Sequence, residues 1–146
     1  MILLYGASVA AGNILGGRLA DRIGAIPALS LIFLGLSVVL LALGAVLTSP
    51  LAAIAVIAVW GGFAFANVPP LQAYTVQIAR EVAPDAVDVA SGLNIGAFNL
   101  GIAFGAWAGG IAVESLGLAA TPYLGAAVVV LGLGLTRLSG RLDRAA

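Results

Sequence analysis

The sequence lacks cysteine, histidine and lysine altogether. Without cysteine the chain has no disulfide, thiolate metal site or cysteine nucleophile, and without histidine it lacks the commonest general base and metal ligand. These absences argue against a hydrolase or zinc enzyme, so we expect no enzymatic activity, no cofactor and no metal. The formal net charge is zero. No nucleic acid is expected as a partner, because a nucleic-acid binder presents a basic face.

Charge of either sign is scarce. Only 8% of the 146 residues are charged, while 62% are hydrophobic. A soluble domain carries about 25% charged residues, so too little polar surface is present to coat a soluble globule of this size. The composition predicts an integral membrane protein whose surroundings are the lipid bilayer.

Long uncharged stretches separate the clusters of charge. A charge at mid-bilayer costs roughly 2.5–3.5 kcal/mol, and about 20 apolar residues cross the hydrocarbon as a helix. Because the stretches are far longer than barrel strands, we predict an all-α membrane protein with residues 1–146 as a single transmembrane region. The five predicted spans are residues 2–17, 27–47, 50–71, 89–113 and 122–138.

Two predicted helix starts share a hydroxyl residue followed by proline. Ser49 is expected to cap the free amides of the third span, with Pro50 at its first position. Thr121 and Pro122 repeat this arrangement at the fifth span. Both residue types are favoured at these positions, so the second and third spans are read as two helices joined by a tight turn.

The arginines predict the orientation. With alternating spans, residues 17–26, 72–88 and the C-terminal tail lie on one side, and that side holds all six Arg. The opposite side holds only Glu114. By the positive-inside rule, we predict a multi-pass protein of the cell membrane, plasma or inner, with the N-terminus outside and the C-terminus in the cytoplasm.

A short motif and one helix carry a family resemblance. The first cytoplasmic loop contains Gly17, Arg18, Leu19, Ala20, Asp21, Arg22, Ile23 and Gly24. It is similar to the Gly-x-Leu-Ala-Asp-Arg-x-Gly loop of the major facilitator superfamily of secondary transporters, although Ala25 and Ile26 replace two basic residues of the family pattern. Within the fourth span, the residues from Ala90 to Gly110 resemble the eleventh helix of bacterial efflux members, especially the arabinose-efflux and chloramphenicol-resistance branch of drug exporters.

The resemblance implies a position within a larger protein. The five spans would correspond to helices eight to twelve of a twelve-helix transporter, so the chain is expected to be a partial C-terminal half that lacks the N-terminal half and the seventh helix. A fragment of the first half is the alternative, because the same loop motif occurs there. That alternative implies an Arg in the third span and a Gly-Pro pair in the fourth, and neither is present.

Five carboxamides lie in or beside the predicted spans and are candidates for lining a substrate cavity: Asn94, Asn67, Gln72, Asn99 and Asn13. A buried amide in hydrocarbon is costly unless it is satisfied. The first, third and fourth spans, which carry the amides, are therefore expected to be interior, and the aliphatic second and fifth spans are expected to face lipid. Asn94 and Asn99 point in different directions from one helix, and Asn94 is favoured for the cavity.

Small residues recur along the fourth span: Gly101, Gly105 and Gly109 stand four residues apart, and Gly92 pairs with Gly96 at the same spacing. This spacing forms a groove that lets another helix approach closely. The groove serves either ordinary helix packing or a sliding surface against the absent half.

Two further features have two readings each. Pro69 and Pro70 either end the third span or form a gate hinge beyond which the helix continues. Asp21 either caps a local turn that closes at Gly24 or, by resemblance, docks onto the positive end of a helix in the opposite half.

The predicted function is that of a C-terminal fragment of a proton-coupled secondary transporter, an antiporter that exports small molecules, drugs or sugars, by alternating access. No predicted span holds an ionisable residue in its middle, so the coupling carboxylate is expected in the absent half and the chain is not expected to transport alone. Its partner is either the missing half or a second copy. The competing prediction is a non-transporting membrane interaction protein or a separately encoded half-transporter.

Overall fold

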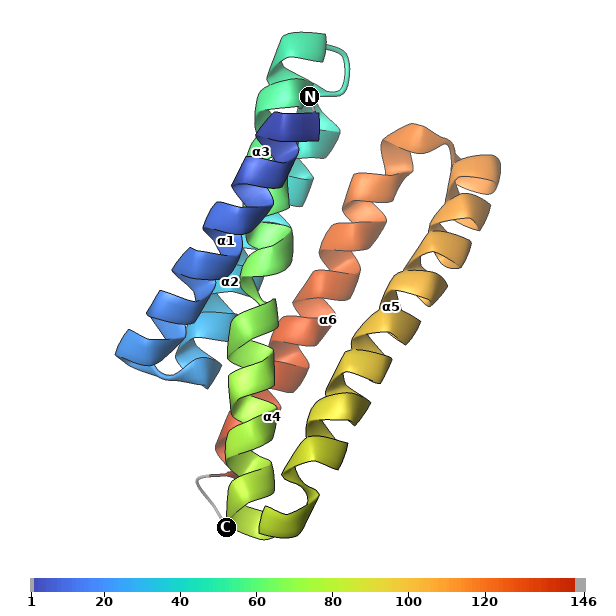
Figure 1. Cartoon of the computed structure of the whole chain (residues 1–146). Helices are drawn as coiled ribbons and strands as arrows, with labels where there is room; N and C mark the ends of the chain where they lie inside the picture. Colours follow the sequence, from blue (N-terminus) through green and yellow to red (C-terminus); the bar gives the residue numbers. More distant parts are fainter. Residues whose placement is uncertain (1, 144–146) are drawn as a thin grey trace.

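The computed structural model describes residues 2–143, which contain helices and turns but no strand. Helices α3 and α4 form one bent stretch, so five helical stretches are long and apolar enough to cross a membrane. They run alternately up and down, and the start of α1 and the end of α6 lie at opposite ends of the molecule (Figure 1). The all-α fold with five spans is confirmed. The elements are α1 (Ile2–Ile23), α2 (Ala25–Val46), α3 (Pro50–Ala66), α4 (Val68–Val82), η1 (Pro84–Ala86), α5 (Val87–Leu116), η2 (Leu118–Ala120) and α6 (Thr121–Leu142).

The first connection is far shorter than expected. Helix α1 continues to Ile23 and α2 begins at Ala25, so residues Gly17 to Arg22 are helical and the expected loop over residues 17–26 is wrong. The only break is Gly24, with φ 88°, a conformation that glycine adopts without the penalty of a side chain. Its N–H donates to the Ala20 carbonyl at 2.8 Å. The charged residues of this segment therefore do not interrupt the helix.

The predicted side-chain caps are wrong. The Ser49 side chain makes no capping hydrogen bond, and instead its backbone carbonyl accepts from the Ala53 N–H at 2.9 Å. Pro50 does stand at the start of α3, where its missing N–H costs nothing. Thr121 is already the first residue of α6, and its hydroxyl donates backwards to the Leu118 carbonyl at 2.8 Å.

Helix α2 forms the centre of the packed region. Its buried side chains recur at helical spacing and include Leu29, Ile32, Leu36 and Leu40, which is one continuous face. Leu36 and Leu40 pack with Ala126 of α6, and Trp60 and Phe63 of α3 complete the cluster. Within this chain the second span is therefore the most deeply buried, contrary to the expectation that it is an outer helix. The aliphatic character that suits a lipid-facing helix suits a buried one equally.

Helices α1 and α3 cross at very short range. A methyl group added to Gly12 would overlap the backbone of Gly62, and one added to Gly16 would overlap the backbone of Ala66. The Ser8 hydroxyl donates to the Ala58 carbonyl across the same interface, and the Tyr5 and Trp60 rings stack with centroids 6.0 Å apart. Small residues four positions apart on both helices thus allow the two backbones to touch.

Helix α5 stands apart from this bundle. None of its residues is buried, and in Figure 1 it leans away from α3 with increasing height above its junction with α4. The fourth span, expected to be interior because of its amides, is thus the most exposed helix in the part of the chain that the structure describes. Its apolar residues include Leu93, Leu100 and Phe104, which are 70%, 73% and 66% exposed.

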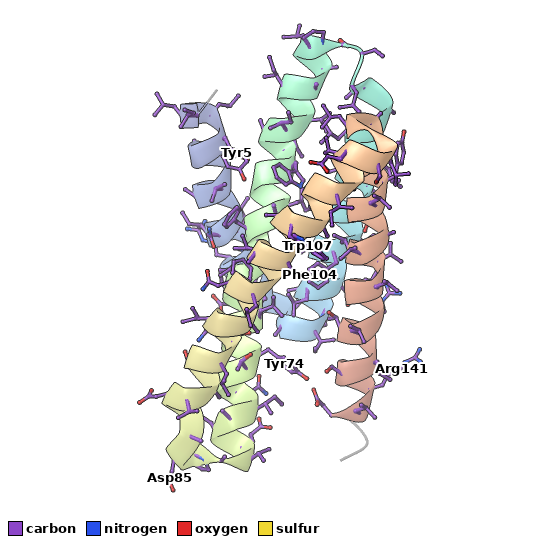
Figure 2. All side chains as sticks on the ribbon, turned by 90° about the vertical axis from the view of Figure 1, so that its right-hand side faces the viewer. Tyr5, Tyr74, Asp85, Phe104, Trp107 and Arg141 are labelled. Carbon is purple, nitrogen blue, oxygen red and sulfur yellow. The ribbon has the colours of Figure 1, made fainter. Side chains whose placement is uncertain are left out.

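The described arginines gather at one end of the molecule. Arg18 and Arg22 lie near the end of α1, Arg80 near the end of α4, and Arg137 and Arg141 near the end of α6. These three helix ends point the same way in Figure 1, and Figure 2 shows Arg141 at the end that also carries Asp85. Glu114 lies near the opposite end, at the end of α5. The alternation predicted from the charges is therefore present, and Arg144 lies outside the described residues.

Candidate functional site

A bend divides the third span just above the candidate site. Asn67 separates α3 from α4 while keeping nearly helical angles (φ −77°, ψ −20°), and the Leu71 N–H donates to its carbonyl at 3.1 Å. Pro69 and Pro70 supply no N–H, so the ladder of α3 is not continued through them. The helix nevertheless resumes to Val82. Pro69 and Pro70 therefore do not stop the helix, as one reading had it; their role as a gate hinge remains a prediction.

Asn67 brings an unpaired acceptor into this bend. The residue is buried, and its Oδ1 has no hydrogen-bond partner among residues 2–143. An unpaired polar atom away from water is costly, so a partner from outside the described residues is expected for this acceptor.

One turn further along, α4 and α5 are joined by a chain of three polar side chains. The Asn94 amide Nδ2 donates to Gln72 Oε1 at 2.7 Å. Gln72 in turn donates through Nε2 to the Ser91 hydroxyl. We call Gln72, Ser91 and Asn94 the amide cluster. It brings together two of the five carboxamides predicted from the sequence, and it places them between two helices that are consecutive in the chain.

A pocket opens beside the amide cluster. It has a volume of about 160 Å³ and is lined by Val68, Leu71, Gln72, Asn94, Ile95 and Phe98. Its walls are apolar apart from the two carboxamides, and no ionisable residue lines it. Such a pocket can hold a small molecule by apolar contact and orient it by a few hydrogen bonds.

The other predicted carboxamides lie elsewhere. Asn13 donates to the Val9 carbonyl of its own helix at 3.2 Å, and Asn99 donates to the Ile95 carbonyl of its own helix at 2.9 Å. Asn99 is exposed and points away from the direction of Asn94, as their helical spacing predicts. Neither side chain joins the amide cluster.

The motif residues at the end of α1 do not line the pocket beside the amide cluster. Arg18, Asp21 and Arg22 are exposed. The Gly17 position faces Pro69, because a methyl group added there would lie 3.6 Å from the proline Cβ. This contact connects the motif to the bend between α3 and α4. The backbone itself closes the turn at Gly24, since the Gly24 N–H donates to the Ala20 carbonyl, and the docking of Asp21 onto a helix of the absent half stays a prediction.

The glycines of α5 have no neighbour. Methyl groups added to them would meet nothing within 4 Å, and this holds for Gly92, Gly96, Gly101, Gly105 and Gly109. The predicted groove exists as a surface, but no helix among the described residues occupies it. Phe104 and Trp107, whose ring centroids are 5.4 Å apart, lie on the same exposed helix (Figure 2).

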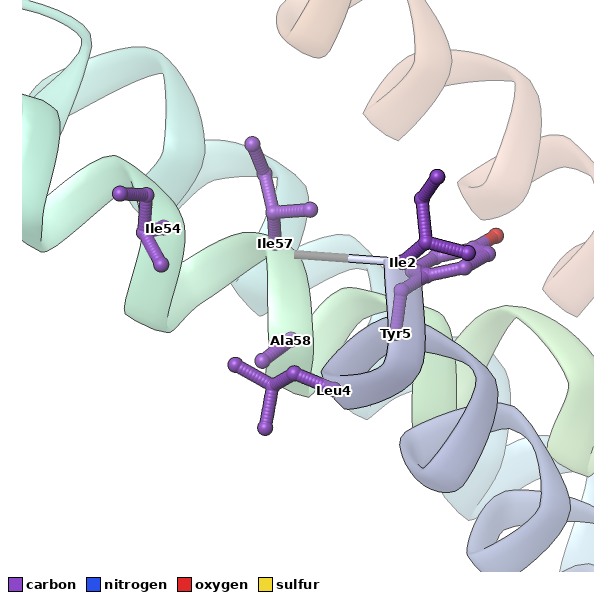
Figure 3. A pocket seen from close by; sticks show the side chains of 6 residues that line it. All are labelled: Ile2, Leu4, Tyr5, Ile54, Ile57 and Ala58. Atoms are coloured by element: carbon purple, nitrogen blue, oxygen red, sulfur yellow. The ribbon is translucent and has the colours of Figure 1, made fainter.

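The sequence did not predict the part played by Ser91, the contact between Tyr74 and Asp143, or a pocket between α1 and α3. Ser91 stands three residues before Asn94, a spacing that places both on one helix face, and this could have identified it. The Tyr74 hydroxyl donates to Asp143 across 69 residues, a contact that no local pattern reveals. A pocket of about 200 Å³ between α1 and α3 is formed almost entirely by aliphatic side chains and Tyr5 (Figure 3).

Known proteins resemble this chain over nearly its whole length. The family model for the Major Facilitator Superfamily matches residues 1–144. Relatives include the uncharacterized MFS-type transporter YtbD of Bacillus subtilis (strain 168), which is 42% identical over 99% of this chain, and the inner membrane transport protein YdhP of Escherichia coli O157:H7, which is 42% identical over 97%. The chain spans only 37% and 35% of these relatives' lengths. No solved structure matches significantly.

Proposed function

The chain belongs to the Major Facilitator Superfamily of transporters, and we propose that it forms the C-terminal part of a proton-coupled exporter of small molecules. In this proposal the five spans are equivalent to helices eight to twelve of a twelve-helix protein. The relatives named as transporters support the transport function. The direction, the coupling ion and the position of the segment are our inferences.

The observation that carries the proposal is the bare surface of α5. A 30-residue helix with no buried residue and an unoccupied row of glycines has a packing surface without a partner. The amide cluster lies at the base of the same helix. A second set of helices against α5 would cover the glycine surface and enclose the pocket beside the cluster, as expected of a transporter whose substrate site lies between two halves.

Proton coupling requires a titratable group within the membrane. The charged side chains among residues 2–143 lie near the ends of the long helices or in η1, and the pocket beside the amide cluster has none. We therefore place the coupling carboxylate on the part of the transporter that this chain does not contain. It follows that the chain alone moves no substrate. We also propose that it resides in the cytoplasmic membrane with its arginine end inside, because cytoplasmic segments carry the excess of basic residues.

A second candidate is a membrane protein that assembles with another polypeptide without transporting by itself. The exposed apolar surface of α5 favours this candidate equally, since it fits a separately made half or a second copy. The two candidates differ in whether a completed assembly moves solute along a gradient.

The test compares the chain alone with a chimera. In the chimera, residues 1–146 replace the matching segment of the Bacillus subtilis relative. Both are reconstituted into vesicles with an imposed pH gradient, and the movement of ethidium, chloramphenicol and L-arabinose is followed with and without a protonophore. We expect the chimera to move at least one of the three in a protonophore-sensitive manner and the chain alone to move none.

Transport by the chain alone would overturn the assignment of coupling to the absent part. A chimera that inserts and folds but moves none of the probes would favour the assembly candidate. The unmodified relative, reconstituted in parallel, controls for the assay.

A further inference from the structure

A separate pocket lies near the arginine end of the molecule, between α2, α4 and α6. It has a volume of about 190 Å³, and its apolar walls include Leu29 and Leu135. Three side chains that carry hydroxyls also line it: Tyr74, Thr136 and Ser139. We call this space the hydroxyl pocket. It borders the pocket beside the amide cluster only through Leu71, which lines both.

The hydroxyls of this pocket have little left to donate. The Tyr74 hydroxyl donates its hydrogen to Asp143 Oδ2, and the Thr136 hydroxyl donates to the Gly132 carbonyl at 2.9 Å. A hydroxyl carries one hydrogen and two acceptor lone pairs, so both oxygens offer a ligand acceptors only. The carboxylate of Asp143 is an acceptor as well, and Tyr74 uses one of its two oxygens.

The charges that face the hydroxyl pocket are acidic. Among the described residues, those whose fields reach the Tyr74 hydroxyl are Asp143 and Glu81. Glu81 follows Tyr74 by seven residues, which is about two helical turns, and therefore shares its face of α4. Arg80 stands one residue earlier and lies off that face.

The arginines of α6 lie on the other side of their helix. Arg137 and Arg141 stand two residues before and two residues after Ser139, and two residues turn a helix by about 200°. Asp143, four residues after Ser139, returns to the same face. Figure 2 shows Arg141 pointing away from Tyr74. The pocket is therefore acidic although it lies at the arginine end.

These properties match a small organic ammonium ion. An ammonium group carries three donors and no acceptor, so it complements the unfilled acceptors of Tyr74, Thr136 and Asp143. A protein cavity of about 150 Å³ holds a benzene molecule, so about 190 Å³ accommodates one ring. A carboxylate has no hydrogen to donate and would be repelled by the acidic groups.

We propose that the hydroxyl pocket is a binding site for small primary ammonium ions that carry one apolar ring. The ammonium group lies between Tyr74, Thr136 and Asp143, and the ring packs against Leu29 and Leu135. This site is separate from the pocket beside the amide cluster, and its occupation does not depend on the proposed transport function.

The test uses three ligands that carry different polar groups on one ring: cyclohexylammonium, cyclohexanol and cyclohexanecarboxylate. Binding to the full chain in phosphatidylcholine nanodiscs is titrated by saturation-transfer NMR, with empty nanodiscs subtracted. We expect saturable binding of the ammonium, and at least tenfold weaker binding of the alcohol and the carboxylate. Binding of either of these as tight as that of the ammonium, or no saturable ammonium binding, would overturn the proposal.

A charge variant tests the role of the carboxylate. Asp143→Asn keeps the size of the side chain, and we expect it to raise the half-saturation concentration of cyclohexylammonium at least fivefold. Asp85→Asn is the matched control, because it removes the same charge from an exposed residue of η1 outside the pocket, and it is expected to stay within twofold of the parent. Equal effects of the two variants would reduce the attraction to general surface charge and overturn the site.

Two filling variants locate the ligand. Leu135→Trp fills the hydroxyl pocket from a side chain that is 67% exposed, and we expect it to abolish ammonium binding. Ile95→Trp fills the pocket beside the amide cluster from a side chain that is 54% exposed, and is expected to leave half-saturation within twofold. The reverse pattern would place the ligand beside the amide cluster and overturn the assignment. Circular dichroism melting of both variants checks that they fold.

A last comparison separates a free amine from a lipid head group, since phosphatidylethanolamine also carries a primary ammonium. Its phosphate would approach Asp143 and Glu81, which repel it. We therefore expect half-saturation by cyclohexylammonium to stay within twofold in nanodiscs that contain phosphatidylethanolamine. A rise of fivefold or more would assign the pocket to the lipid and overturn the free amine. None of these titrations needs a gradient or a second half, so their outcome is independent of the chimera.

Discussion

The bundle of α1, α2, α3 and α6 and the isolated helix α5 use glycine in opposite ways. In the bundle, Gly12 and Gly16 face the backbone of α3, Gly35 faces the Phe63 ring and Gly44 faces the Tyr123 ring, all so closely that an added methyl would collide. On α5, Gly101 and its fellow glycines face open space. Glycines four residues apart therefore contact a neighbouring helix in α1, whereas on α5 they have no neighbour.

This difference teaches that a small-residue repeat identifies a helix-packing surface but not its partner. The series in α5 is longer than the pair Gly12 and Gly16, yet only that pair is occupied among the described residues. In lipid, apolar side chains gain little by associating, and close backbone packing supplies much of the helix–helix attraction. The stability of this chain therefore resides in the bundle, while α5 depends on what packs against it.

The largest expected effect comes from filling an occupied glycine. Gly16→Leu would force α1 away from the Ala66 backbone, and we expect a loss of about 3 kcal/mol or more in the free energy of unfolding. Gly105→Leu, the matched change on α5, meets nothing and is expected to change it by less than about 1 kcal/mol. Denaturant titrations in detergent micelles, followed by circular dichroism, measure both. Equal losses for the two variants would break the comparison.

A smaller effect is expected from cutting the tie between α5 and α4. Asn94→Leu removes the interhelical hydrogen bond to Gln72, and polar contacts of this kind in membranes contribute about 0.6–1.7 kcal/mol. We expect faster amide hydrogen exchange in the lower half of α5 and unchanged exchange in α2. Asn99→Leu is the control, because Asn99 bonds only within its own helix. Accelerated exchange in α2 would contradict the independence of the two regions.

The smallest effect concerns the bundle's polar contact with α4. Tyr74→Phe removes the hydrogen bond to Asp143 at an exposed site, and we expect a loss of about 0.5 kcal/mol. Tyr123→Phe is the control, since its ring packs on Gly44 and the ring is kept. The same denaturant titration measures both variants. A loss above about 2 kcal/mol for Tyr74→Phe would show that α4 depends on this contact as strongly as the bundle depends on its core.

The number and order of the spans could be predicted because they follow from hydropathy and charge, which act locally along the chain. The helix ends could not. Arg18 and Asp21 were read as loop residues, although the helix continues to Ile23, because charge reports position relative to the membrane and not backbone conformation. Only Gly24 carried the signal that ends the helix.

The residue types of the site could be predicted from the sequence, but the contact between Gln72 and Asn94 could not. Gln72 and Asn94 were both candidates because amides are costly in hydrocarbon. Their contact depends on the angle of the hairpin between α4 and α5, which no periodicity encodes. The expected outer position of the second span was wrong within this chain for the same reason: an aliphatic surface is equally suited to lipid and to protein, and only the arrangement of the neighbouring helices decides between them.

Gly24 has a mechanical consequence. A single residue connects two helices of 22 residues each, so the link has no slack to absorb displacement. Any movement of the end of α1 is passed directly to the start of α2, whose Ala28 and Leu29 are fully enclosed in the packed core. The charged end of α1 is therefore separated by a single residue from a helix whose second turn lies in the packed core.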